Sequence, residues 1–219
     1  MGGGSDMTKL TRLQSFLTDI KKSEMSCERI AQKHILAARS EHLSDEQERD
    51  LRIAVSDSFK VPVTSVCVVG SAKLGFRLFR KPPNQKQNTP DRPQFSSFDD
   101  FSDVDVAVIS QGTFLSHWRK VYEFYSDGGY TTRGNWIGNA ESNNFSYFLT
   151  HGWVRPDHLP GTGDYDQKVV WDAKVNEINQ RKIVPVAVKV GLYFDDKFLT
   201  GYHANGIRKI KEQNDRAQA

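Results

Sequence analysis

Two apolar runs decide the fold: Ser65-Val66-Cys67-Val68-Val69, followed by Gly70-Ser71, and Val104-Asp105-Val106-Ala107-Val108-Ile109, preceded by Asp103. Both are rich in β-branched side chains, which favour strands. Asp103 and Asp105 are two residues apart, so on a strand both carboxylates project from one face. Paired oxygen ligands suit a hard cation such as Mg²⁺. A Gly-Ser turn between a strand and a helix offers N–H groups and a hydroxyl to a phosphate. Together the motifs indicate a site for a nucleoside triphosphate and its metal.

The composition is that of a globular protein. The chain has 219 residues, of which 37% are hydrophobic and 26% are charged, and this argues against wholesale disorder. The net charge of +3 permits nucleotide or nucleic-acid partners without requiring them. No apolar run approaches the roughly 18–20 residues that span a bilayer, so we expect no membrane partner. We interpret Cys27 and Cys67 as buried reduced thiols of a cytoplasmic protein.

The chain reads as one domain. We interpret residues 1–7 as an expression leader before a native Met7 and leave them out of the fold. Residues 8–219 then form a single domain, with N-terminal helices over 8–60 and a core over 61–219. We find no internal repeat and no linker that would divide it.

Periodicity predicts the elements along the chain. Ser44 and Gln47 have the spacing of a capping box, which marks the start of a helix that continues to Phe59. The other expected helices cover residues 8–39 (with a break at 23–26), 71 to about 79, 113–125, 166–182 and 203–211, and the expected strands cover 64–69, 103–109 and 182–194.

Two segments lack such periodicity. Residues 80–100 hold four prolines within 82–93 and few apolar side chains, which predicts an inserted loop. A loop this long is either functional or disordered, and its basic residues leave two readings open: contact with a polyanion, or a solvated insertion. Residues 127–165 are rich in Gly, Asn, Ser and aromatic side chains, and they look irregular or made of short strands. Trp136, Trp153 and Tyr202 would either stack on a base or pack in the interior.

The two motifs resemble a known family. Gly70-Ser71 with Lys73-Leu74-Gly75, followed by Ser102-Asp103-Val104-Asp105, is similar to the catalytic core of the polymerase-beta-like nucleotidyltransferases. The resemblance covers residues 64–110, about a fifth of the chain. It implies an α+β fold in which a mixed β-sheet is flanked by helices.

The resemblance also implies roles for single residues. Asp103 and Asp105 would be the catalytic metal ligands for two Mg²⁺, which stabilise charge on the attacking and leaving oxygens. Gly70 and Ser71 would contact the β- and γ-phosphates. Lys73 and Arg77, expected on the helix after the turn, would add positive charge near them.

Two departures from the family pattern stand out. The insertion 80–100 lengthens the connection between the motifs. The family also has a third carboxylate on a later strand, whereas the best candidate strand here carries Lys189 at that place. Asp195, Asp196 and Asp157 are the candidate substitutes, and Asp164 and Asp166 stand out less. The absence of any third acid is the other alternative.

Three functions follow as hypotheses. The first is a Mg²⁺-dependent nucleotidyltransferase that moves a nucleoside monophosphate from ATP or another NTP to a hydroxyl of RNA, a nucleotide, a protein or a small molecule. The length favours the minimal or toxin-like kind, including toxin–antitoxin or phage-defence enzymes. The second is an inactive nucleotidyltransferase-like domain that binds a nucleotide as a regulatory subunit. The third is a protein partner directed to nucleic acid by the basic loop and tail.

Other chemistries lack their motifs. The sequence contains no Gly-x₄-Gly-Lys-[Ser/Thr] loop, which argues against a P-loop nucleotide site. The six histidines and two cysteines show no zinc-ligand spacing. A serine hydrolase would need a nucleophile setting such as Gly-x-Ser-x-Gly, which is also missing.

Overall fold

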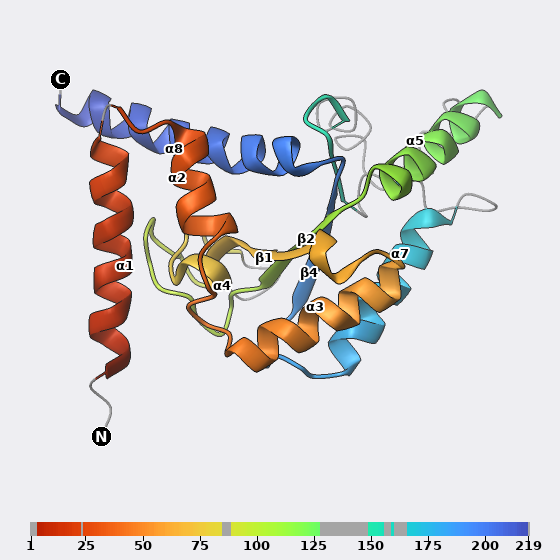
Figure 1. Ribbon diagram of the computed structural model, residues 1–219, viewed down its shortest axis with the longest axis horizontal. Helices are drawn as coiled ribbons and strands as arrows, with labels where there is room; N and C mark the ends of the chain where they lie inside the picture. Colours follow the sequence, from red (N-terminus) through yellow and green to blue (C-terminus); the bar gives the residue numbers. More distant parts are fainter. Residues whose placement is uncertain are drawn as a thin grey trace.

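The computed structural model describes residues 4–22, 24–84, 89–127, 149–155, 159 and 166–218. Several helices precede the first strand, and helices and strands alternate from there on, in keeping with the expected α+β class (Figure 1). In chain order, they are α1 (Gly4–Lys21), α2 (Cys27–Ala31), the π-helical turn η1 (Gln32–Leu36), α3 (Asp45–Phe59), the 3₁₀ turn η2 (Val63–Ser65), β1 (Val66–Val69), α4 (Gly70–Leu74), β2 (Val104–Ile109), α5 (Gln111–Ser126), β3 (Trp153–Val154), α7 (Gln167–Gln180), β4 (Val188–Tyr193) and α8 (Asp196–Gln218).

The described strands form one mixed sheet of four strands in the order β1-β2-β4-β3. β1 runs antiparallel to β2, and β4 runs parallel to β2 on its other side. In this register Asp105 lies between Val69 of β1 and Lys189 of β4. The sheet therefore places the second acidic position of the sequence motif next to the end of the strand that leads into Gly70-Ser71.

Helices cover both faces of the sheet. One face carries Val104, Val106 and Val108 and packs against α3, α5 and α7. The other face carries Ala107 and Tyr193 and packs against α1, α2 and α8. Figure 1 shows α8 and α2 on one side of the strands and α3 and α7 on the other. This alternation of side chains along β2 leaves Asp105 on the face of α8, because it shares the parity of Ala107.

The capping box predicted at Ser44 is confirmed. The Ser44 hydroxyl accepts from the backbone N–H of Gln47 at 3.1 Å, and the Gln47 side chain accepts from the Ser44 N–H at 3.0 Å. These two bonds satisfy N–H groups that have no partner inside a helix, so the start of α3 is determined locally. α3 then ends at Phe59, as expected, with Lys60 in the left-handed conformation.

Two elements are shorter than expected. The helix predicted to reach residue 79 ends at Leu74, because Gly75 adopts φ +88° and donates its N–H to the Ser71 carbonyl at 2.8 Å. The strand predicted over 182–194 begins only at Val188. Pro185 lacks the N–H that a ladder requires, and the Val188 N–H is taken by the Asn179 side chain at 2.8 Å.

The N-terminal segment and the cysteines complete the outline. α1 begins at Gly4, inside the segment interpreted as a leader, and the predicted break at 23–26 separates α1 from α2. Cys27 and Cys67 are both free and partly buried. Among the described helices, none is long and apolar enough to cross a bilayer.

Candidate functional site

The two sequence motifs meet in space. Gly70 begins α4 directly after β1 and has φ +70°. A Cβ atom built on Gly70 would lie only 2.6 Å from Oδ2 of Asp105. No side chain fits at that distance, so glycine is required both for the backbone conformation and for the close approach of the carboxylate. Gly70 and Asp105 therefore lie next to each other, and the shared nucleotide site that the two motifs suggest stays a prediction.

The acid pair lies at the start of β2. Asp105 is part of the strand and Asp103 immediately precedes it. Burial is the largest cause that raises the pKa of Asp105, to about 6, and the charge of Asp103 adds to the rise. Two carboxylates in this arrangement repel each other when both are ionised, and a bound cation removes that repulsion. The donor chemistry therefore fits a divalent metal ion held by these two side chains.

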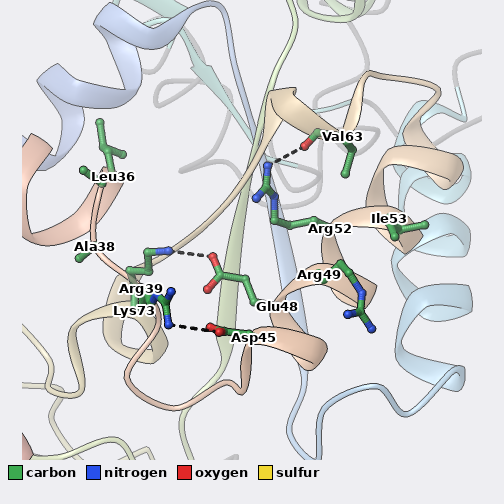
Figure 2. Close-up of a pocket in the computed structure, with 11 residues that line it drawn as sticks. Leu36, Ala38, Arg39, Asp45, Glu48, Arg49, Arg52, Ile53, Val63 and Lys73 are labelled. Carbon is green, nitrogen blue, oxygen red and sulfur yellow. Dashed lines mark hydrogen bonds and ion pairs between the residues drawn. The ribbon is translucent and has the colours of Figure 1, made fainter.

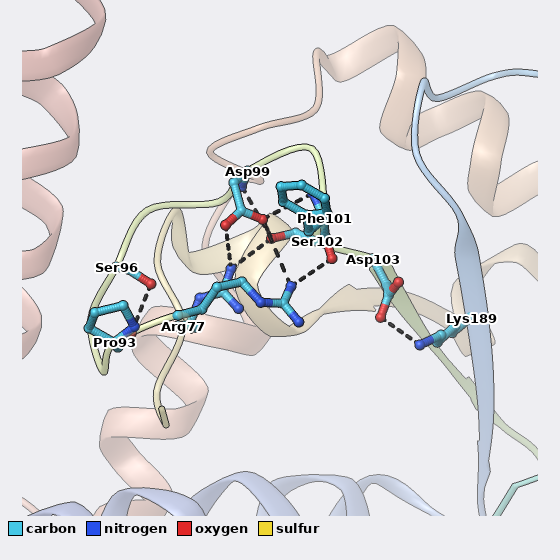
Figure 3. Close-up of polar contacts among 9 residues, drawn as sticks. Arg77, Pro93, Ser96, Asp99, Phe101, Ser102, Asp103 and Lys189 are labelled. Carbon is cyan, nitrogen blue, oxygen red and sulfur yellow. Dashed lines mark hydrogen bonds and ion pairs between the residues drawn. The ribbon is translucent and has the colours of Figure 1, made fainter. Parts of the chain in front are cut away.

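Two lysines act on the acid pair from different elements. Lys189, opposite Asp105 in the register of β4, places its Nζ 2.6 Å from Oδ2 of Asp103 (Figure 3). Lys81, from the inserted loop, opposes the rise in the pKa of Asp105 through its charge, as does Lys189. The sequence motif contained neither residue. Lys81 was visible only as one of the basic residues of the inserted loop, and Lys189 only as a lysine where an acid was expected.

Lys73 points away from this site. Its Nζ lies 2.8 Å from Oε1 of Glu48, and the lysine is only 5% exposed. The pair lines a cavity of about 520 Å³ between α3 and the segment that follows η1, together with Arg39, Arg49 and Arg52 (Figure 2). The predicted phosphate contact of Lys73 stays a prediction, and it would require the pair with Glu48 to open.

Arg77 lies beyond α4 and not on a helix as expected. Its guanidinium donates to the Ser102 hydroxyl at 2.9 Å and to a carboxylate oxygen of Asp99 at 3.2 Å (Figure 3). Burial is the main cause that lowers the pKa of Arg77, and the charge of Asp99 opposes this. The side chain thus ties the segment before Asp103 to the segment after Gly75. Its predicted role in nucleotide binding stays a prediction.

The inserted loop is more ordered in its described part than the sequence indicated. Lys81 and Arg92 exchange two backbone hydrogen bonds, each of 2.9 Å, and Asn84 and Thr89 form a similar pair. Arg80 pairs with Asp91, and Arg92 is buried and donates to the Phe101 carbonyl. Most basic side chains described in this loop are therefore engaged within it, and Lys81 is the one whose charge reaches the acid pair.

In the part of the chain that the structure describes, no third acid joins Asp103 and Asp105. No group of three or more acidic, histidine or cysteine side chains that could hold a metal occurs among the described residues. Asp195 instead caps α8, because its carboxylate accepts from the N–H groups of Lys197 and Phe198. β2 and β4 are parallel, so Asp195 and Asp196 lie at the opposite end of the sheet from Asp103. Asp166 precedes α7.

Several predicted candidates lie outside the described residues: Asp157, Asp164 and Trp136. The other two aromatic candidates pack together. The rings of Trp153 and Tyr202 have centroids 4.8 Å apart, and Tyr193 lies 6.1 Å from Trp153. Tyr193 and Trp153 are buried, whereas Tyr202 is 40% exposed. The arrangement favours interior packing for Trp153, and base stacking by Tyr202 stays a prediction.

Comparison with known proteins yields no relative. No family model matches the chain, no curated protein matches it, and no solved structure matches it.

Proposed function

We propose that this chain is a Mg²⁺-dependent nucleotidyltransferase of the polymerase-beta-like type, which transfers a nucleoside monophosphate from an NTP to a hydroxyl. The observation that carries the proposal is the contact between the Gly70 turn and the Asp105 carboxylate. A turn suited to phosphate stands beside a carboxylate pair suited to a cation, and an NTP with its metal needs both at once.

The order of the elements supports the same reading. A strand leads through Gly70-Ser71 into α4, the next strand is antiparallel and carries the acid pair, and a later strand lies parallel to it. The resemblance implies a mixed sheet flanked by helices, and this sheet is consistent with that expectation. The long connection between the motifs is accommodated as a paired loop, so it does not separate them.

Each residue of the site has a role in this proposal. A Mg²⁺ ion bound by Asp103 and Asp105 would neutralise charge on the phosphate oxygens during transfer. The turn at Gly70 and Ser71 binds the β- and γ-phosphates through backbone N–H groups and the hydroxyl. Lys81 contributes positive charge from the loop side, which favours the triphosphate and the departing pyrophosphate.

The proposed transfer is an in-line displacement at the α-phosphorus. The acceptor oxygen forms a bond to the α-phosphorus while the bond between that phosphorus and the bridging oxygen of the β-phosphate breaks. Pyrophosphate leaves with the bridging oxygen, and the hydroxyl proton passes to solvent or to a base of the complex. The site must therefore hold the triphosphate in line with the acceptor, which is the task of the Gly70 turn and the acid pair.

A second candidate function is a nucleotide-binding domain without chemistry. The observation that favours it is Lys189, which neutralises Asp103 where a further carboxylate would complete the site. Such a domain would bind an NTP and a cation but release no pyrophosphate.

The experiment that separates the two is incubation with each α-³²P-labelled NTP and Mg²⁺, with and without total RNA. Pyrophosphate release and label transfer to RNA or protein are followed. If the chain is an enzyme, we expect label transfer that is lost when Asp103→Asn and Asp105→Asn are combined. Asp100→Asn is a matched control, since Asp100 is exposed and close in the chain to the acid pair. Nucleotide binding without transfer would favour the second candidate, and transfer that survives in the double variant would refute the assignment.

A further inference from the structure

Lys189 lies beside the acid pair and forms an ion pair with Asp103. It is paired with Asp105 across parallel strands, so both side chains project from the same face of the sheet. Its side chain is 64% exposed, yet the ammonium reaches Asp103, whose side chain is only 20% exposed, at 2.6 Å (Figure 3). A flexible lysine at this exposure is free to extend into solvent. The ammonium instead lies on the carboxylate that a metal ion would use.

The charges around the acid pair are few. The two carboxylates carry at most two negative charges, and Lys189 offsets one of them. Two divalent ions in a two-metal site stand about 3.5–4 Å apart and add four positive charges, so they depend on several shared anionic ligands. The described residues supply two carboxylates, the Lys189 ammonium on Asp103, and the charges of Lys81 near Asp105 and Arg77 near Asp103. This set suits one divalent ion and does not suit two.

We propose that the Lys189 ammonium occupies one of two adjacent cation positions, so that Asp103 and Asp105 bind a single divalent ion beside a built-in monovalent cation. The inference rests on the cation-binding role given to the acid pair in the proposed function. It assigns Lys189 as a positioning residue, which holds Asp103 and lies where a second metal ion would bind.

The rival reading is an ordinary surface ion pair with no effect on the site. Exposed pairs contribute little to stability, and many form only because two long side chains meet. That reading makes a different prediction, because removal of such a lysine would leave metal binding at its neighbours almost unchanged. The two readings are therefore separated by counting metal ions.

The experiment is a titration of the full chain with Mn²⁺ alone, with bound ions counted by electron paramagnetic resonance. We expect the wild-type protein to bind one Mn²⁺. Lys189→Asp should bind two, because the variant replaces a cation by a third carboxylate. Lys189→Gln should still bind one, with affinity tighter by about tenfold, since the repulsion between ammonium and metal is gone. Lys209→Asp, an exposed change of the same charge on α8, should behave as wild type.

Two results would overturn the inference. One is binding of two Mn²⁺ by the wild-type chain. The other is the same count and affinity in wild type, Lys189→Gln and Lys189→Asp. Thermal unfolding of each variant in metal-free buffer shows whether it folds. If Lys189→Asp does not fold, Lys189→Gln still provides the test. The count requires no turnover, so failure of nucleotide transfer would leave it intact. Loss of the proposed cation site would instead appear as unchanged Mn²⁺ binding in the Asp103 and Asp105 variants.

Discussion

Gly70 and Asp105 stand in a contact that only a glycine permits. The backbone of Gly70 has φ +70°, and its missing Cβ would fall 2.6 Å from a carboxylate oxygen of Asp105. The contact joins the end of β1 to the neighbouring strand at the position where Val69 pairs with Asp105. It is the point at which two motifs separated by more than thirty residues of sequence become one site.

Gly70→Ala is expected to destabilise the protein by about 1–3 kcal/mol, since an alanine is strained at positive φ and its methyl displaces the carboxylate. The rate of nucleotide transfer should fall by more than the loss of folded protein accounts for. The measurements are chemical denaturation and the labelled-NTP assay at a temperature where the variant is folded. Gly112→Ala is the control, because a Cβ there meets no atom within 4 Å and alanine favours a helix. Equal stability of Gly70→Ala and wild type would contradict the geometry.

Asp105→Asn is expected to raise the free energy of unfolding in metal-free buffer by roughly 1–3 kcal/mol at neutral pH. The folded pKa of Asp105, about 6, lies above its usual value, so the wild-type fold is favoured while this group is protonated and loses that stability as the pH rises through 6. The gain of the variant should therefore be largest above pH 6 and vanish near pH 4. Urea denaturation over this range measures it.

The same variant should lose its response to metal. Mg²⁺ is expected to stabilise the wild-type chain and to leave Asp105→Asn unchanged, because the amide neither carries charge nor repels Asp103. Asp100→Asn should keep the response. A variant that is less stable than wild type at pH 7 would show that Asp105 supports the fold and would speak against a site kept for function.

Arg77→Ala is expected to destabilise the protein by about 1–3 kcal/mol, because it removes a buried side chain and the hydrogen bonds that its guanidinium gives to Asp99 and Ser102. Arg80→Ala removes a pair that is open to solvent and should leave the denaturation midpoint nearly unchanged. If Arg77→Ala instead keeps full stability and loses nucleotide binding, the phosphate role predicted from the sequence is the correct one.

Because of His203, the free energy of unfolding is expected to fall in weak acid. It is buried in α8, and burial lowers its pKa to about 4. The unfolded chain takes up this proton near pH 6.5, so stability is present above that value and is lost as the pH falls through 4. The loss amounts to about 3 kcal/mol for this one group. His203→Leu should show a shallower decline between pH 7 and pH 4, measured by urea denaturation. An identical slope in both proteins would contradict the burial of an uncharged imidazole.

Local patterns in the sequence predicted much of the fold because their causes are local. The capping box at Ser44 and Gln47 needs only four neighbouring residues, and the structure confirms it. The apolar run Val104–Ile109, rich in β-branched residues, predicted a strand, and its valines pack on one face of the sheet. The end of α4 and the start of β4 were harder to predict. Gly75 ends α4 through its positive φ, and Pro185 delays β4 because it has no backbone N–H.

The sequence by itself therefore predicted where most elements lie, the acid pair and the turn that accompanies it, although α8 extends over Asp196–Gln218 instead of the expected 203–211. Only the tertiary structure decided which side chains form ion pairs with each other. Lys73 was expected near phosphate, yet Glu48 of α3 holds it, and Lys189 reaches Asp103 from a strand 86 residues away. A charged side chain takes whichever opposite charge the packing brings within reach, and that choice depends on sheet order and register. The short-range pattern of a single chain contains the charges but does not contain those distances.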